Sequence, residues 1–535
     1  MSTIAQLINN NFGGIRRKDS AFTDDKITCS DCQNVELFYT KLNSGVGIRT
    51  APGNISVTSK TTNGIIESVI PPDENIIEIF ESIQDAKEYV FVYTENTTEG
   101  KLYNYNLLTN ELTKIDVSNS VGTDKLSKTG KASGTDFSQG WLDMFVFSNG
   151  KEVVYIYSDT EIHTQPTVES ADKIKLVDVD GRTVRGLGLS VYDSRLWIFD
   201  GKVLWYSQQG DCRVFNYNDP SITTSSGYIE MVKEITAIAP YLDSLAVFHK
   251  DSSALIKTEA TTLFTKSDES PGGCASYRAL VFHGTDLYFY DDTKKGVFSF
   301  KQIVNGDKTL GENIALNIQE ELMDISSKDL SKIKALSVVT ADRNEVWMLV
   351  PISNEENRSI VLIYDYLRGE WIKRKCQHIN TIGILFDGLY SAGKEIYEEY
   401  RTQSFDGEFI PSYYICSMFN LGADNTLKIT KFPPRLTVDG NYKCEFLVKY
   451  VKNYAINKKP KIKEIKSKQL SNILKYDSGM RYDEGHIYVP NSVNAIVKIP
   501  SSTFKTLEIT FYTEKNSQQF SIKAIEFSEI KVKQV

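Results

Sequence analysis

The sequence predicts an all-β protein: a β-propeller of six to seven blades with an extended N-terminal arm and a C-terminal β-sandwich domain. Period-two alternation and short β-rich runs that end in Asn, Asp or Gly recur from about residue 88, whereas helical periodicity is scarce. The chain also contains 29 Tyr and 26 Phe, and aromatic residues favour strands. A unit of two strands joined by a tight polar turn returns about every 50 residues, which indicates a repeat architecture.

Residues 1–75 break this pattern and are expected to form an N-terminal arm with the first strands. They contain FGG at residues 12–14, the strand VELFYTKL at 35–42 and the segment RTAPGN at 49–54. Propellers are often closed by an N-terminal strand that completes the last blade. We therefore expect part of this segment to pair with residues near 390–400.

Residues 76–400 are expected to form the propeller. A four-stranded blade is apolar on both faces, so several blades must stack around an axis to bury them. The clearest hairpin is RLWIF at 195–199, followed by the DG turn at 200–201 and the strand VLWY at 203–206. Repeat units begin near residues 89, 144, 187, 235, 279, 336 and 379.

Residues 401–535 are expected to form the β-sandwich, because the repeat stops and Lys-rich strands follow. The window KKPKIKEIKSK at 458–468 is the most basic in the chain. A solvated loop or an edge strand guarded by lysines is the preferred interpretation. The alternative is a surface that faces a neighbouring acidic subunit.

The length, charge, apolar runs and cysteine content of the chain restrict the classes of protein to which it is expected to belong. A chain of 535 residues is expected to contain two or more packed units. Its net charge of -8 gives no reason to expect tight nucleic-acid binding. No long apolar run or secretory signal is evident, so we expect no membrane span and synthesis in a cytoplasm. The seven cysteines are an odd number, which favours reduced thiols.

Motifs for catalysis are lacking, so we expect no enzyme, no catalytic residues, no metal and no cofactor. Cys29 and Cys32 form a CxxC without a second pair at zinc-site spacing, and a structural role is preferred. DVDG at residues 178–181 resembles part of a calcium loop, but Leu189 stands where the loop needs Glu. A polar turn between blades is therefore preferred. At least four of the tryptophans are expected in the core: Trp141, Trp197, Trp205, Trp347 and Trp371.

Several of these segments resemble the tail nozzle or tail-stabilisation (tail tubular B-like) proteins of short-tailed bacteriophages. NNFGGI at 10–15 and the APG segment at 51–53 are similar to the opening of such proteins, although Thr50 and Ala51 stand where the family has Lys or Arg. The central match is LSVYDSRLWIFDGKVLWYSQQGDCRVFN at 189–216. The residues that carry the resemblance are Gly13, Gly14, Pro52, Gly53, Arg195, Trp197, Gly201, Tyr206, Ser207, Gly210, Asp211 and Phe215.

The resemblance implies a structural virion protein, assembled in the host cytoplasm. It would form a ring of six subunits at the distal end of a short tail, around a channel for genome retention and ejection. The expected partners are identical subunits, the portal, adaptor or other tail proteins, and tail fibres. DNA would pass through without tight binding, which a channel wall of acidic or neutral character permits.

Two other classes of function stay open. A carbohydrate-binding or carbohydrate-cleaving propeller is possible because glycosidase carboxylates are placed by the fold and leave no local motif. Such a protein would act as a receptor-binding component. An intracellular propeller scaffold that binds protein partners through its loops is the second alternative.

Overall fold

The computed structural model describes most of the chain. The described residues are 2–9, 11–16, 27–39, 45–62, 65–139, 142–157, 160–161, 168–170, 173–219, 223–259, 263–305, 310–323, 325–340, 343–352, 359–375, 377–419, 427–430, 434–439, 444–452, 460–466, 494–498, 503–516 and 518–533. Trp141, Cys376 and the two ends of the basic window at 458–468 lie outside them.

The chain is mostly β and divides into two compact units, each built from separate stretches of sequence. Unit 1 comprises Met1–Asn54, Leu362–Cys376 and Tyr400–Val535. Unit 2 comprises Ile55–Val361 and Gln377–Glu399. The N-terminal residues therefore share a unit with the C-terminal strands, whereas the sequence predicted a separate arm over 1–75. Three limits of the units fall inside strands, namely β6 (Gly53–Ser56), β34 (Ser359–Asp365) and β38 (Ile396–Thr402).

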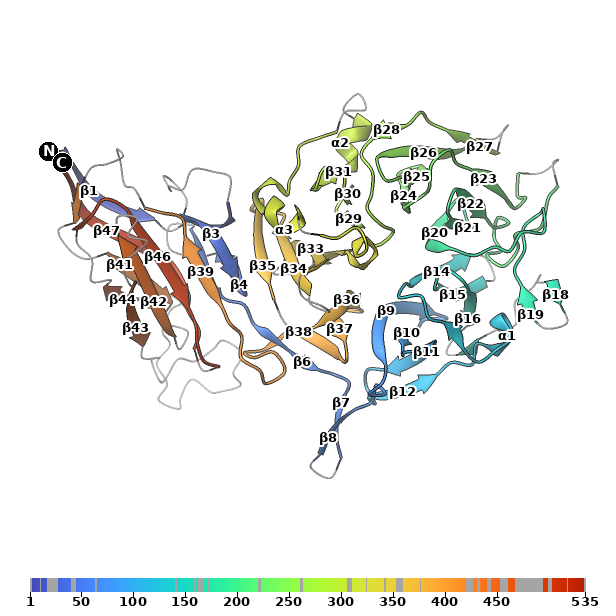
Figure 1. Cartoon of the computed structure of the whole chain (residues 1–535), viewed down its shortest axis with the longest axis horizontal. Coiled ribbons are helices and arrows are strands. Elements are labelled where there is room, and N and C mark those ends of the chain that lie inside the picture. Colours follow the sequence, from blue (N-terminus) through green and yellow to red (C-terminus); the bar gives the residue numbers. More distant parts are fainter. Residues whose placement is uncertain are drawn as a thin grey trace, which may run out of the picture. The chain divides into compact units, whose positions relative to one another are not determined.

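Small sheets follow one another along the chain, and those of unit 2 lie around a common centre (Figure 1). The first five belong wholly to unit 2, whereas the sixth and seventh each include residues of unit 1. The first four sheets are β9 (Asn75–Gln84), β10 (Lys87–Glu95), β11 (Glu99–Asn106), β12 (Glu111–Lys114) with β13 (Leu126–Ser127); β14 (Ser133–Gln139), β15 (Leu142–Ser148), β16 (Val153–Tyr157), β17 (Thr160–Glu161); β20 (Leu187–Tyr192), β21 (Arg195–Asp200), β22 (Val203–Tyr206), β23 (Gly227–Glu230); and β24 (Ala237–Tyr241), β25 (Ser244–Phe248), β26 (Ser252–Glu259), β27 (Leu263–Lys266) with β28 (Ser270–Pro271).

The next three sheets continue the series. They are β29 (Leu280–His283), β30 (Asp286–Asp291), β31 (Gly296–Ser299); β32 (Lys334–Val339), β33 (Asn344–Pro351), β34 (Ser359–Asp365), β35 (Glu370–Arg374); and β36 (Ile379–Leu385), β37 (Gly388–Gly393), β38 (Ile396–Thr402), β6 (Gly53–Ser56). Two minor hairpins are β7 (Ser59–Thr62) with β8 (Ile65–Ser68), and β18 (Val168–Ser170) with β19 (Lys173–Lys175). Short helices accompany the sheets: α1 (Ser118–Val121), α2 (Phe300–Asn305), α3 (Gln319–Met323) and the 3-10 turns η1 (Leu316–Ile318) and η2 (Leu330–Lys332).

The core of unit 2 consists of apolar layers between successive sheets. Phe91 of the first sheet packs on Phe145 of the second, with ring centroids 4.8 Å apart. Similar layers join the second sheet to the third and the third to the fourth. Another layer contains Ile79 of the first sheet and Tyr390 of the seventh. Each sheet is apolar on both faces, so burial requires a neighbour on each side.

Unit 1 contains two larger sheets. One has the order β2 (Phe12–Ile15), β3 (Ile27–Gln33), β39 (Tyr413–Cys416), β46 (Leu507–Tyr512), β42 (Glu445–Lys452), β43 (Lys461–Lys466). The other contains β4 (Val35–Tyr39), β5 (Val46–Thr50), β47 (Ser521–Lys533), β40 (Leu427–Thr430), β45 (Thr503–Phe504), β1 (Ser2–Asn9), β41 (Arg435–Asp439) and β44 (Asn494–Lys498). Phe419, which bridges to β46, packs on Phe527 of β47 at 5.2 Å between ring centroids.

Several local predictions are confirmed. β21 pairs with β22 around the turn at Asp200 and Gly201, as the aromatic hairpin predicted. The N-terminal strand β6 lies beside β38, in the region near 390–400 expected to receive it. Strand β43 covers the described part of the basic window and is the edge strand of its sheet, with Lys461 exposed.

Candidate functional site

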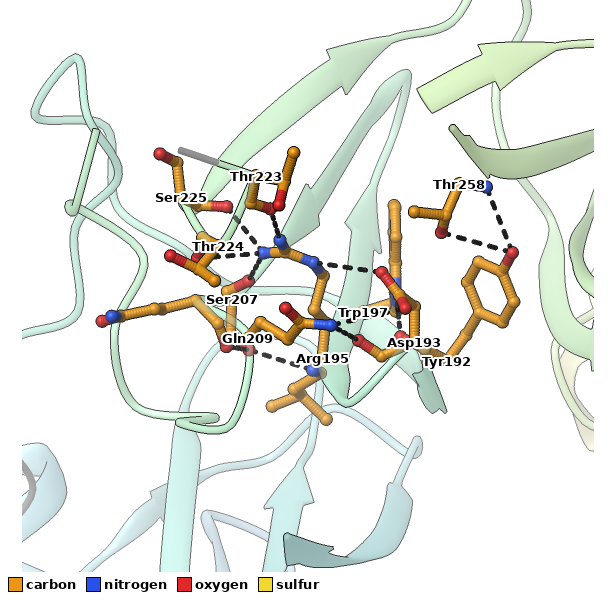
Figure 2. A network of polar contacts seen from close by, with 12 residues as sticks. Tyr192, Asp193, Arg195, Trp197, Ser207, Gln209, Thr223, Thr224, Ser225 and Thr258 are labelled. Atoms are coloured by element: carbon orange, nitrogen blue, oxygen red, sulfur yellow. Dashed lines mark hydrogen bonds and ion pairs between the residues drawn. The ribbon is translucent and has the colours of Figure 1, made fainter. Parts of the chain in front are cut away.

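Arg195, Trp197 and Ser207 of the central motif are buried and belong to a polar network at the third sheet (Figure 2). Arg195 begins β21, and its side chain is fully buried. Its Nη1 donates hydrogen bonds to the carbonyl oxygens of Ser207 at 2.8 Å and Ser225 at 2.6 Å. The guanidinium also donates to the carbonyl oxygens of Thr223 and Thr224. One arginine therefore holds both ends of the loop that connects β22 to β23.

The loop itself is fixed to the preceding turn. The Ser207 hydroxyl accepts a hydrogen bond from Leu196 N at 3.0 Å and donates to the carbonyl oxygen of Gln208 at 3.0 Å. Gly210 N donates to the carbonyl oxygen of Ser194 at 2.8 Å. Gly210 has a φ of 81°, a conformation that glycine adopts without strain.

Aromatic rings surround the arginine. The indole Nε1 of Trp197 donates to the carbonyl oxygen of Tyr192 at 3.0 Å. The Trp197 ring lies 5.2 Å from the Tyr206 ring and 5.0 Å from the Phe264 ring, centroid to centroid. Arg195 Cζ lies 5.5 Å from the Tyr206 centroid, within the range of a cation–π contact. The cation is thus enclosed by carbonyl oxygens and ring faces.

The remaining motif residues of this sheet also serve packing and turns. Asp211 accepts hydrogen bonds from Arg213 N at 3.0 Å and from the Arg213 guanidinium at 2.9 Å. Phe215 is buried in the layer between the second and third sheets. Gly201 has a φ of 59° in the turn between β21 and β22.

Burial governs the ionisation of this cluster. It lowers the pKa of Arg195, although the neighbouring Asp193 carboxylate opposes this effect. An arginine starts from so high a pKa that it stays charged at neutral pH. Burial raises the pKa of Tyr206, so its hydroxyl stays protonated. Near neutral pH the Arg195 guanidinium therefore keeps its positive charge and the Tyr206 hydroxyl keeps its proton.

The N-terminal motif residues lie in unit 1 and belong to close backbone approaches. Gly14 N donates to Glu370 Oε2 at 3.0 Å, and a Cβ at Gly14 would collide with the backbone of Trp371. The carbonyl oxygen of Gly13 accepts a hydrogen bond from the Tyr414 hydroxyl at 2.8 Å. Gly14 therefore allows β2 to lie against the backbone of Trp371 where a side chain would not fit.

Pro52 and Gly53 also lie close to other segments of unit 1. The carbonyl oxygen of Pro52 accepts a hydrogen bond from Arg374 Nη1 at 2.8 Å. A Cβ at Gly53 would collide with the carbonyl oxygen of Ser404. The motif residues thus separate into two sets, one in each unit, and each set stabilises the backbone around it.

The other candidate residues have structural partners. Asp178 is buried and accepts hydrogen bonds from Asp180 N at 3.0 Å, Arg182 N at 2.8 Å and Trp205 Nε1 at 2.9 Å. Its carboxylate therefore organises a polar turn, as predicted. Cys29 and Cys32 are buried free thiols in β3, and burial raises the pKa of Cys29.

Four of the five tryptophans are buried, as predicted, and Trp141 lies outside the described residues. Within the described part of the chain, no three His, Cys, Asp or Glu side chains gather where they could hold a metal ion. None of the helices described is both long enough and apolar enough to cross a membrane.

Sequence reasoning missed a buried charged cluster, formed by Glu78, Arg278, Lys334 and Thr381. Glu78 lies in β9 and pairs with Arg278 at 3.1 Å and Lys334 at 2.6 Å. Thr381 of β36 donates a hydrogen bond to the same carboxylate. Burial opposes ionisation of Glu78, but the two cations and Thr381 outweigh it, so the pKa of this carboxyl lies below its usual value. The signal in the sequence was a single Glu within the apolar run NIIEIF.

Comparison with known proteins gives little further information. No family model matches the chain, and no curated protein matches it in sequence. Among solved structures, one similar chain is described as "AfRom2 CNH domain". It has a TM-score of 0.28 and 11% sequence identity over 48% of this chain and 82% of that chain. A likeness this weak carries no argument about fold or function.

Proposed function

We propose that the chain is a structural protein of a short-tailed phage, which forms a ring, expected to contain six subunits, at the distal end of the tail. The observation that carries this proposal is the structural role of the motif residues. Arg195, Trp197 and Ser207 bond to the protein's own backbone, as residues that hold a scaffold would. A resemblance carried by such residues supports a shared architecture rather than a shared reaction.

The proposed architecture is a seven-bladed β-propeller with a β-sandwich. Three features of the strands support the propeller. The seven sheets follow in sequence, the last sheet packs on the first through Ile79 and Tyr390, and β6 adds to the outer edge of the last sheet. Closure of this kind leaves few exposed strand edges. The contact between Phe419 and Phe527 supports the packing of the two sheets of unit 1 as a sandwich.

In this proposal, the subunits of the ring together enclose the channel through which the genome leaves. The net charge of -8 suits a wall along which DNA slides, because cationic contacts to phosphates would retard it. The portal or adaptor proteins and the tail fibres are the proposed neighbours, and the virion tail is the proposed location.

The proposal is tested by electron microscopy of particles from the source, with gold-labelled antibodies against this chain. Label at the distal tip of a short tail is the expected result. Native mass spectrometry of the purified full chain tests the ring, and a sixfold assembly is expected. Absence of the protein from all particles would overturn the proposed function.

A further inference from the structure

Unit 2 exposes apolar side chains at the end of its sheets where the first strand of a sheet turns into the second. Leu242 lies in the turn between β24 and β25 and is 78% exposed. Phe282 of β29 is also exposed, and its ring stacks on Tyr241 with the centroids 6.1 Å apart. Val339, the last residue of β32, is 64% exposed. Three successive sheets therefore present apolar surface that another protein could cover.

Contacts between successive sheets show that these turns lie at the same end of unit 2. The Tyr192 hydroxyl, at the end of β20, donates a hydrogen bond to the carbonyl oxygen of Asp243 at 2.8 Å. His283 of β29 and Ser337 of β32 share a hydrogen bond of 2.9 Å between Nδ1 and Oγ. Two further hydrogen bonds join the first sheet to its neighbours: Asp85 N to Asp143 Oδ2 and Phe386 N to Glu81 Oε2. We call this surface the turn end of unit 2.

The turn end is acidic as well as apolar. The residues of five turns between a first and a second strand are all described, and four of these turns contain an aspartate. None of the five contains a lysine or an arginine. The aspartates are Asp85, Asp193, Asp243 and Asp387. A surface that combines exposed apolar and positively charged side chains would complement the turn end.

The two units of the chain have formal charges of opposite sign. Unit 1 contains 31 Lys and Arg and 20 Asp and Glu, which gives a charge of +11. Unit 2 contains 30 Lys and Arg and 49 Asp and Glu, which gives a charge of -19. Unit 1 of one molecule therefore attracts unit 2 of another, over a range of about 10 Å at 0.1 M salt. Charge thus favours a second copy of the chain as the partner of the turn end.

The edge strand β43 of unit 1 has the chemistry that the turn end requires. Ile462 is 58% exposed and stands between Lys461, which is exposed, and Lys463, which is half-buried. On the neighbouring strand β42, Lys449 pairs with Ile462. Burial and the nearby Lys461 lower the pKa of Lys452, so positive charge is concentrated at this edge. The edge therefore combines an exposed apolar side chain with several cations.

From these observations we infer that the turn end of unit 2 binds the edge formed by β42 and β43 in a second copy of this chain. In this contact Ile462 packs on the exposed apolar side chains of the turn end, and the lysines beside it face the aspartates. The two surfaces differ, so each bound molecule keeps one surface of each kind free, and such contacts can close into a ring. The inference rests on the proposed ring, because it names the surfaces that join its subunits.

The test is sedimentation velocity and native mass spectrometry of the purified full chain and of two charge-reversed variants. Asp243→Lys with Asp387→Lys changes the turn end, and Lys461→Glu with Lys463→Glu changes the edge of unit 1. Each variant alone is expected to associate at least about tenfold more weakly than the wild type. An equimolar mixture of the two is expected to assemble, because every contact can then join surfaces of opposite charge.

Salt provides a second measurement on the unaltered chain. The Debye length falls from about 10 Å at 0.1 M salt to about 3 Å at 1 M, so attraction between exposed charges is screened. We therefore expect the wild-type assembly to dissociate at the higher concentration.

Controls at the opposite end of the same sheet separate this contact from a general effect of charge or hydrophobicity. Asp251→Lys is matched to Asp243→Lys, because each aspartate pairs with one lysine, at 2.9 Å and 3.0 Å, but Asp251 follows β25 whereas Asp243 precedes it. Leu242→Asn removes exposed apolar surface and suits the φ of 52° at this position, so it should weaken association without lowering the melting temperature. Val232→Asn is its control, because Val232 is exposed but precedes β24.

Three outcomes would overturn the inference. If the charge-reversed variants assemble as strongly as the wild type, other surfaces join the subunits, and the proposed ring still stands. If the wild type stays monomeric, the ring fails together with the inference. If Lys461→Glu with Lys463→Glu abolishes binding of a 30-base-pair DNA duplex but leaves self-association unchanged, the lysines serve nucleic acid instead of a second copy. Antibody labelling of particles tests the proposed location independently of all three.

Discussion

Arg278 Nε lies 3.1 Å from Glu78 Oε2, with the two side chains 7% and 3% exposed. Arg278 precedes the fifth sheet, whereas Glu78 belongs to the first. Lys334 of β32 and Thr381 of β36 approach the same carboxylate. Side chains from four parts of unit 2 therefore meet at one negative charge. This ion cluster joins sheets that are far apart in sequence, so we expect the stability of unit 2 to depend on it.

We expect Glu78→Gln to lower the free energy of unfolding by about 3–5 kcal/mol, because it leaves Arg278 and Lys334 buried without a matching charge. Urea denaturation of the full chain measures the change. Glu88→Gln is the matched control, since Glu88 is exposed on the adjacent strand β10, and its effect should stay within about 0.5 kcal/mol. Equal losses in the two variants would contradict a role for the cluster.

The same carboxylate predicts how stability depends on acid. The pKa of Glu78 is lowered in the folded protein, mainly because Arg278 and Lys334 outweigh the effect of burial. Its contribution is therefore present above its ordinary pKa of about 4.5 and is lost as the pH falls through the lower, folded value. We expect stability to fall more steeply below about pH 4.5 in the wild type than in Glu78→Gln. Melting temperatures from pH 7 to pH 3 provide the measurement, and parallel curves would disprove the assignment.

Arg195→Lys tests whether the shape of the buried cation matters. The guanidinium reaches the carbonyl oxygens of Ser207 and Ser225 through Nη1 and that of Thr223 through Nη2, whereas the single nitrogen of a lysine ammonium cannot reproduce this fork. We expect a loss of about 2–4 kcal/mol of unfolding free energy, as two or more buried carbonyls lose their donors. The control is Arg185→Lys, because Arg185 is 56% exposed in its pair with Asp200 and should cost less than about 1 kcal/mol. A loss as small as the control's would mean that charge alone is required.

The local parts of the fold could be predicted from the sequence, because the interactions that fix them are local. The hairpin of β21 and β22 needs an aromatic run and the turn at Asp200 and Gly201, and both are adjacent in the chain. Buried tryptophans and the edge position of the Lys-rich β43 also follow from residue type.

Long-range arrangements could not be predicted in the same way. Strand β1 pairs with β47 at the other end of the chain, and no pattern within either strand specifies that partner. The partners of Glu78 could not be predicted either, because they come from three segments that are distant from it in the sequence.

Gly53→Ala tests the close approach that the N-terminal motif allows. A Cβ at this position would collide with the carbonyl oxygen of Ser404, which is backbone and cannot rotate away. We expect a loss of about 3 kcal/mol of unfolding free energy, because β6 or the segment at Ser404 must move. Gly407→Ala is the matched control: Gly407 has a φ of 87° but no atom within 4 Å of an added Cβ, so the substitution should cost only about 1 kcal/mol of backbone strain. Urea denaturation measures both variants. If Gly53→Ala cost no more than Gly407→Ala, the close approach to Ser404 would not explain why glycine stands at position 53.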